Sequence, residues 1–122
     1  MKILHIDDST EIQEMYSKML KADKSDIQTV DNARDGLKLV SENTYDLILL
    51  DMCMPEYSGL HFIKDLKMQR PSELKKVVLV SVLKFSQGQK DELTKLGINL
   101  VEEKPYTIKK LREIQRKVAL TP

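Results

Sequence analysis

The stretch YDLILLDMCMPEYSGL, residues 45–60, joins an apolar run to an acidic end. Residues 47–50 are apolar at every position, which is typical of a strand covered on both faces. The run ends abruptly in Asp51. A carboxylate is costly inside a core but is tolerated where a strand end meets water. The stretch therefore predicts a buried strand that carries a functional acidic group at its carboxyl end.

Similar short apolar runs occur on both sides of this stretch, at residues 3–6, 27–30, 77–80 and 98–101. Between and after them, apolar residues recur every three or four positions, which predicts one-sided helices. These segments are residues 12–20, 33–40, 60–66, 85–96 and 108–118, and the fourth has a thin apolar stripe weakened by Gly88. Alternating strands and helices indicate a parallel sheet with helices on both faces. We expect one α/β domain over residues 1–122.

Composition excludes several classes of protein. Twenty Lys and Arg against nineteen Asp and Glu give a net charge of +1, so no overall field attracts nucleic acid or an anionic membrane. Cys53 is the single cysteine, which rules out an internal disulfide and a four-thiolate metal site. The polar N-terminus MKILHIDDST does not resemble a signal peptide, and no apolar run has the length of a membrane span. These features predict a cytoplasmic protein with neither nucleic acid nor membrane as a direct partner.

Several residues mark expected helix ends or structural positions. Asp8, with Glu11 three positions later, resembles a capping box and predicts that Asp8 caps the first helix. Gly97 is placed to end the fourth helix, and Pro71 to end the third. His5 lies within an apolar strand, where a structural role is the simpler interpretation.

Polar residues gather where the predicted strands end. Asp7 and Asp8 follow the first strand, Asp51 the third and Ser81 the fourth, while the fifth leads out to Lys104. In a parallel sheet these ends lie at one edge, where ligands bind. Three carboxylates there repel one another unless a cation is bound. An all-oxygen ligand set favours Mg2+ over Zn2+.

This set of groups suits phosphoryl transfer. Asp51 is the candidate nucleophile, because a carboxylate can attack phosphorus to give an acyl phosphate. The reaction requires positive charge and hydrogen-bond donors at the phosphoryl oxygens. Mg2+, the Lys104 ammonium and the Ser81 hydroxyl supply them.

The same residues resemble the receiver domain of two-component response regulators, of the single-domain CheY type. The resemblance rests on the Asp7-Asp8 pair, DMCMPEYSG at residues 51–59, Ser81 after VVLV, and KPY at residues 104–106. It spans essentially the whole chain. It implies a flavodoxin-like doubly wound sheet of five parallel strands in the order 2-1-3-4-5, with five helices.

The resemblance also implies a role for each matching residue. Asp51 is similar to the phosphoacceptor that receives a phosphoryl group from a histidine kinase or phosphotransfer protein. Asp8 and Asp51 resemble direct Mg2+ ligands, Asp7 one that acts through water, and Cys53 a main-chain carbonyl ligand. Ser81 and Lys104 resemble the groups that contact the phosphoryl oxygens. The fourth helix, fifth strand and fifth helix resemble the surface that binds a downstream protein.

Two positions depart from the family pattern. Val101 stands three positions before Lys104, where many receivers have an aromatic residue that reports phosphorylation. Val82 follows Ser81, where the family usually has a small residue, so we expect it to crowd the phosphoryl pocket. Cys53 stands at a position where the residue varies among receivers and tunes the rate at which the acyl phosphate is hydrolysed.

Two other functions compete with the phosphorylated switch. A haloacid dehalogenase type phosphatase requires a second aspartate two residues after the nucleophile, and Cys53 stands there. A receiver-like interaction module that takes no phosphate is the main alternative. Val82 and Val101 favour it, whereas the set formed by Asp7, Asp8, Asp51 and Lys104 favours the switch.

Overall fold

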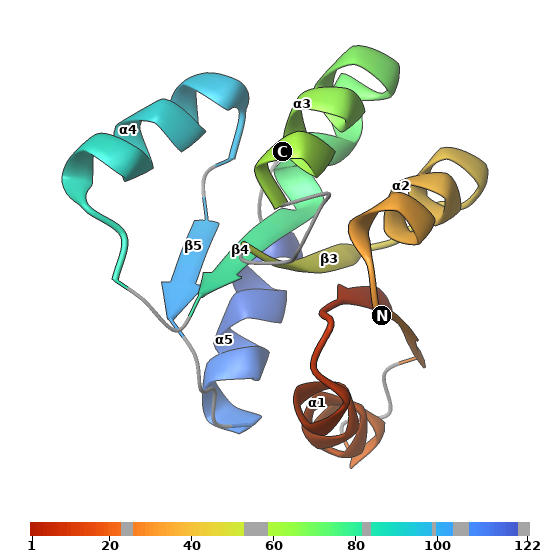
Figure 1. Ribbon diagram of the computed structural model, residues 1–122. Coiled ribbons are helices and arrows are strands. Elements are labelled where there is room, and N and C mark those ends of the chain that lie inside the picture. The colour runs from red at the N-terminus through yellow and green to blue at the C-terminus, as the bar shows by residue number, and fades with distance from the viewer. Residues whose placement is uncertain (23–25, 53–58, 82–83, 99, 104–107, 120–122) are drawn as a thin grey trace.

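The computed structural model describes residues 1–22, 26–52, 59–81, 84–98, 100–103 and 108–119. Strands and helices alternate along the chain (Figure 1), as the sequence predicts. The strands are β1 (Lys2–Ile6), β2 (Asp26–Val30), β3 (Leu47–Asp51), β4 (Val77–Ser81) and β5 (Leu100–Glu103). The helices are α1 (Thr10–Ala22), α2 (Ala33–Glu42), α3 (Gly59–Gln69), α4 (Gln87–Leu96) and α5 (Ile108–Ala119), with a short 3-10 helix, η1 (Pro71–Lys76), before β4.

The sheet is parallel throughout, and its strand order is β2-β1-β3-β4-β5. This order confirms the predicted doubly wound, flavodoxin-like arrangement. Helices α1 and α5 lie on one side of the sheet, and α2, α3 and α4 lie on the other (Figure 1). β3 is the central strand and pairs with β1 and β4.

Side chains on neighbouring positions of each strand enter two separate cores, because successive residues of a strand point to opposite faces. Ile48 and Leu50 of β3 pack with α2 and α3, whereas Leu47 and Leu49 pack with Tyr16 of α1 and with α5. All five residues of β3 are buried. The continuous apolar run at residues 47–50 is therefore explained by helices on both faces.

The fifth strand begins two residues later than predicted, at Leu100 instead of residue 98. Gly97 ends α4 in the left-handed conformation, with φ of 104°. The next residue, Ile98, is buried, and its N–H donates to the Leu93 carbonyl as part of the helix end. An apolar residue in a helix cap thus resembles the start of a strand. The start of α4 is well defined, because Ser86 and Gln89 form a capping box.

A buried acidic side chain holds the connection between α3 and β4 together. Glu73 of η1 is 5% exposed and lies 3.0 Å from Arg70 Nη2 and 2.7 Å from Lys76 Nζ. Arg70 also donates to the carbonyls of Val40 and Asn43 at the end of α2. We refer to Arg70, Glu73 and Lys76 as the Glu73 cluster. It ties α2, α3 and η1 together near the amino end of β4.

No helix in the described part of the chain is long and apolar enough to cross a membrane.

Candidate functional site

Three carboxylates converge at the carboxyl edge of the sheet. One oxygen from each of Asp7, Asp8 and Asp51 lies within 4.8 Å of the other two. We refer to these three residues as the acid cluster. The structure therefore brings together all three acidic residues that the sequence places at strand ends.

The strand register explains this convergence. Ile6 of β1 is the register partner of Leu50 of β3, so the next residues, Asp7 and Asp51, are neighbours across the two strands. Their main-chain surroundings are fixed by the sheet: the Asp7 N–H donates to the Val30 carbonyl at 3.1 Å, and the Met52 N–H to the Val80 carbonyl at 2.9 Å. Asp7 and Asp51 of the acid cluster are thus attached to hydrogen-bonded main chain at the end of the sheet.

The prediction that Asp8 caps α1 is wrong, and Ser9 is the cap. The Ser9 hydroxyl accepts from the Ile12 N–H at 3.3 Å, and the Ser9 carbonyl accepts from Gln13 at 3.0 Å. The Ser9 N–H in turn donates to Asp7 Oδ1 at 2.9 Å. Asp8 does not cap the helix and lies exposed beside the other two carboxylates.

The electrostatics of the site match a hard divalent cation. Asp7 is fully buried, Asp51 is 6% exposed and Asp8 is exposed, so two of three mutually close carboxylates have lost most of their water. Burial raises the pKa of the Tyr16 phenol far above its usual value, and the charges of Asp7 and Asp51 raise it further. A concentrated negative charge with oxygen ligands and one solvent-facing member is a suitable binding place for Mg2+. The residues therefore fit this ion.

The layer beneath the acid cluster contains a histidine stacked on a tyrosine. His5 and Tyr16 are both fully buried, and their ring centroids are 4.7 Å apart with an interplanar angle of 28°. His5 Nε2 lies 3.7 Å from Asp7 Oδ2. The structural position of His5 in the strand is as expected, but its contact with the site is not predicted from the sequence. Alternation along β1 is the signal that connects them, since His5 and Asp7 share a face of the sheet.

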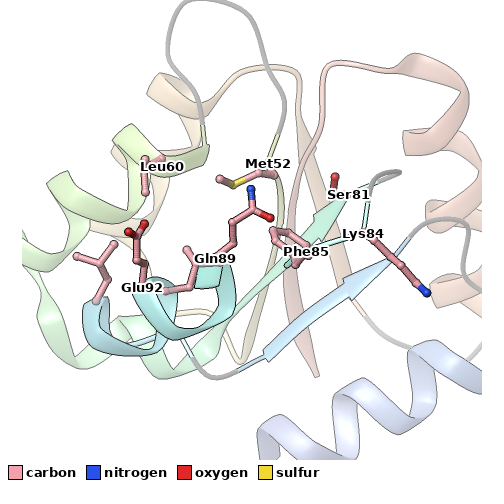
Figure 2. Close-up of a pocket in the computed structure, with 9 residues that line it drawn as sticks. Met52, Leu60, Ser81, Lys84, Phe85, Gln89 and Glu92 are labelled. Carbon is pink, nitrogen blue, oxygen red and sulfur yellow. The ribbon is translucent and has the colours of Figure 1, made fainter. Parts of the chain in front are cut away.

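Ser81 ends β4 one residue beyond Val80, the register partner of Asp51. It is 4% exposed and also lines a cavity of about 340 Å³. Figure 2 shows Met52 and Leu60 on one side of this cavity and Gln89 and Glu92 of α4 on the other. The cavity therefore separates the end of β3 from α4.

The first residue of α3 lies against the end of β3. A Cβ atom on Gly59 would stand 2.8 Å from the Asp51 carbonyl oxygen and 3.1 Å from the Met52 Cα. Both neighbours are main-chain atoms, which have little freedom to move away. The close approach therefore requires glycine at this position.

Other predicted residues of the site lie outside the described part of the chain. These are Lys104 with the following Pro105 and Tyr106, the Cys53 carbonyl, and Val82. Val101 is described, and its side chain is partly buried against the core on the α2, α3 and α4 side of the sheet.

Sequence and structure comparisons identify related proteins. The sequence pattern of the response regulator receiver domain matches residues 3–116. Two-component response regulator 24 of Arabidopsis thaliana is 33% identical over 118 residues, which cover 94% of this chain and 81% of that protein. The CpxR homolog of Haemophilus influenzae, a transcriptional regulatory protein, is 31% identical over 81% of this chain, but the match spans only 40% of that protein.

Solved structures give the same result for the fold. The chemotaxis protein CheY4 of Vibrio cholerae superimposes with a TM-score of 0.86 at 26% identity, covering 96% of this chain and 97% of that chain. The receiver domain of a sensor histidine kinase from Pseudomonas aeruginosa, which has a magnesium ion coordinated in its active site cleft, gives 0.82 at 21% identity, with 97% of each chain covered. The order of the strands, the three strand-end carboxylates and the match over residues 3–116 lead to one conclusion: the chain belongs to the response regulator receiver domain family of two-component signalling.

Proposed function

We propose that this chain, as a single domain over residues 1–122, is a cytoplasmic phosphorylation-controlled switch with Asp51 as the phosphoacceptor. The observation that carries the proposal is the acid cluster, in which Asp51 ends the central strand beside two further carboxylates. The Asp51 carboxylate attacks the phosphorus of a phosphohistidine on a kinase or phosphotransfer protein. An O–P bond forms, the N–P bond breaks, and the imidazole leaves as the neutral ring after taking up a proton.

Asp8 and Asp51 would hold Mg2+ directly, Asp7 through water, and the Cys53 main-chain carbonyl would add a further ligand. The bound ion supplies positive charge for the phosphoryl oxygens. Ser81, at the end of the next strand, donates its hydroxyl to one of these oxygens, and Lys104 contributes a second positive charge. Loading and hydrolysis of the acyl phosphate are the only reactions that we assign to the protein.

The output surface in this proposal consists of α4, β5 and α5, which would bind a downstream protein. Phosphorylation adds about 1.5 to 2 negative charges at the sheet edge. These charges attract Ser81 and Lys104 and thereby change the position of the segment that leads into α4. α4 is suited to move, because Leu93 is the one buried residue among its ten positions and a cavity lies between it and β3.

Intact-mass analysis tests the proposal. The parent protein and Asp51→Asn are incubated with acetyl phosphate and Mg2+, and each is also incubated with Mg2+ alone. We expect one phosphoryl group to be added to the parent and none to Asp51→Asn. A parent that gains no mass under conditions in which it binds Mg2+ would identify the chain as an interaction module that works without phosphate.

The switch requires a second measurement. Beryllofluoride with Mg2+ imitates the phosphorylated acceptor, and we expect it to shift the NMR signals of residues 81–106. If the shifts are confined to residues 7–9 and 51–53, the phosphoryl group does not change the conformation beyond the site. The proposed switch is then wrong.

A further inference from the structure

We propose that His5 is a positioning residue for the acid cluster, which orients the Asp7 carboxylate through its Nε2–H and thereby strengthens binding of a divalent cation. This inference rests on the proposed function, because it concerns the same cation. It adds a residue that lies one layer below the carboxylates and within the core.

His5 is buried without hydrogen bonding to any of the described residues, which is unusual for a polar side chain. His5 is fully buried, and within the described part of the chain neither of its ring nitrogens has a hydrogen-bond partner. Buried polar groups nearly always have such a partner, since leaving one unpaired destabilises the fold. Ile3, two residues earlier on the same face of β1, is apolar and equally buried. An apolar residue would therefore suit the core better than His5 does, which points to a function for the imidazole.

The ring of His5 is directed toward Asp7. His5 shares a face of β1 with Asp7, and its Nε2 lies 3.7 Å from Asp7 Oδ2. This distance exceeds the limit of about 3.2 Å for a good N–H···O bond, so the contact is electrostatic and is not a hydrogen bond. A nitrogen lone pair facing the carboxylate would be repelled. The geometry therefore favours the tautomer with the proton on Nε2.

With this tautomer, both oxygens of Asp7 have a defined neighbour. Oδ1 accepts from the Ser9 N–H at 2.9 Å, and Oδ2 faces His5. The stack on Tyr16, with centroids 4.7 Å apart, fixes the plane of the imidazole. Groups that orient ligands in this way commonly change metal affinity by about 10 to 100-fold when they are replaced.

The experiment compares three variants with the parent. His5→Phe keeps an aromatic ring for the stack but removes the N–H, and His5→Gln keeps an N–H donor at a similar reach. His61→Phe on α3 is the control, since His61 is exposed. Mg2+ affinity is measured by calorimetric titration, and the free energy of unfolding is measured in urea without Mg2+. We expect His5→Phe to weaken Mg2+ binding about tenfold, His5→Gln to stay within about threefold of the parent, and His61→Phe to bind as the parent does.

Stability separates positioning from packing. We expect His5→Phe to unfold at the same urea concentration as the parent or at a higher one, because it removes two unpaired nitrogens from the core. Loss of affinity together with a matching loss of stability, in both His5→Phe and His5→Gln, would mean that His5 only fills space, and would overturn the inference. Equal Mg2+ affinity in the parent and His5→Phe would overturn it as well.

NMR gives a readout that does not depend on affinity. The chain has two histidines, so a sample without a histidine tag and with 15N-labelled imidazole rings gives signals from His5 and His61 alone. We expect His5 to be protonated on Nε2 and its ring signals to shift as Mg2+ is added, while those of His61 remain unchanged. A proton on Nδ1 would contradict the inference. A parent that binds no Mg2+ would overturn the proposed cation site itself, whereas insensitivity to His5→Phe in a parent that binds Mg2+ overturns only the role of His5.

Discussion

The acid cluster and the Glu73 cluster both contain buried acidic side chains, but they lie at opposite ends of the sheet and differ in how charge is arranged. Glu73 has two cations of its own segment within 3.0 Å, and each is three residues away along the chain. Asp7, Asp8 and Asp51 instead lie close to one another, with oxygens within 4.8 Å. A carboxylate that is neutralised by neighbouring side chains holds segments of the fold together. Several carboxylates close to one another instead form a suitable binding place for an exchangeable cation.

The largest expected effect comes from breaking the Glu73 cluster. Arg70→Ala removes the ion pair with Glu73 and the hydrogen bonds to Val40 and Asn43. We expect the free energy of unfolding in urea to fall by about 2 to 3 kcal/mol, because a buried carboxylate loses one of its cations and the end of α2 loses a donor. Mg2+ affinity should not change. Lys67→Ala, at an exposed position of α3, is the control and should stay within about 0.5 kcal/mol of the parent.

The second prediction concerns the acid cluster. At a free Mg2+ concentration ten times its dissociation constant, we expect the parent to gain about 1.4 kcal/mol of stability, since the ion binds only the folded chain. Asp8→Asn should lose this gain, and Arg70→Ala should keep it. Urea unfolding with and without Mg2+, at constant ionic strength, measures the effect. An equal gain in Asp8→Asn would show that the ion acts elsewhere.

The smallest expected effect concerns Tyr16, which lies beside the acid cluster and is fully buried. The pKa of Tyr16 is raised by burial and by Asp7 and Asp51, so its phenol stays neutral in the fold while the unfolded chain ionises near pH 10. The stabilising effect of the neutral phenol is complete below that pH and is lost as the pH rises above it. Between pH 8 and pH 10.5, the parent should lose about 0.8 kcal/mol more than Tyr16→Phe does. Parallel pH profiles of the two proteins would contradict this, and urea unfolding at each pH provides the measurement.

The sequence predicts the strands and the convergence of Asp7, Asp8 and Asp51 because these follow from local patterns. A run that is apolar at every position and ends in Asp51 requires helices on both faces, and parallel strands place their ends at one edge. The roles assigned to Asp51, Ser81, Cys53 and Lys104 remain predictions.

Other features depend on contacts between distant segments or on a choice between neighbours. Asp8 and Ser9 are both suitable helix caps, and sequence alone does not show which of them makes the hydrogen bond. Arg70 contacts the end of α2, thirty residues before it, so no periodic pattern predicts the contact. The contact between His5 and Asp7 depends on the rotamers of both side chains.

The central position of β3 has a consequence for how a signal can travel. Asp51 ends a strand that is hydrogen-bonded on both sides and buried along its whole length. A chemical change at that residue would therefore act on a strand that is buried and hydrogen-bonded on both sides. In the proposed switch, a displacement caused by phosphorylation of Asp51 would therefore appear in α4, which has one buried residue, while β3 stays in place.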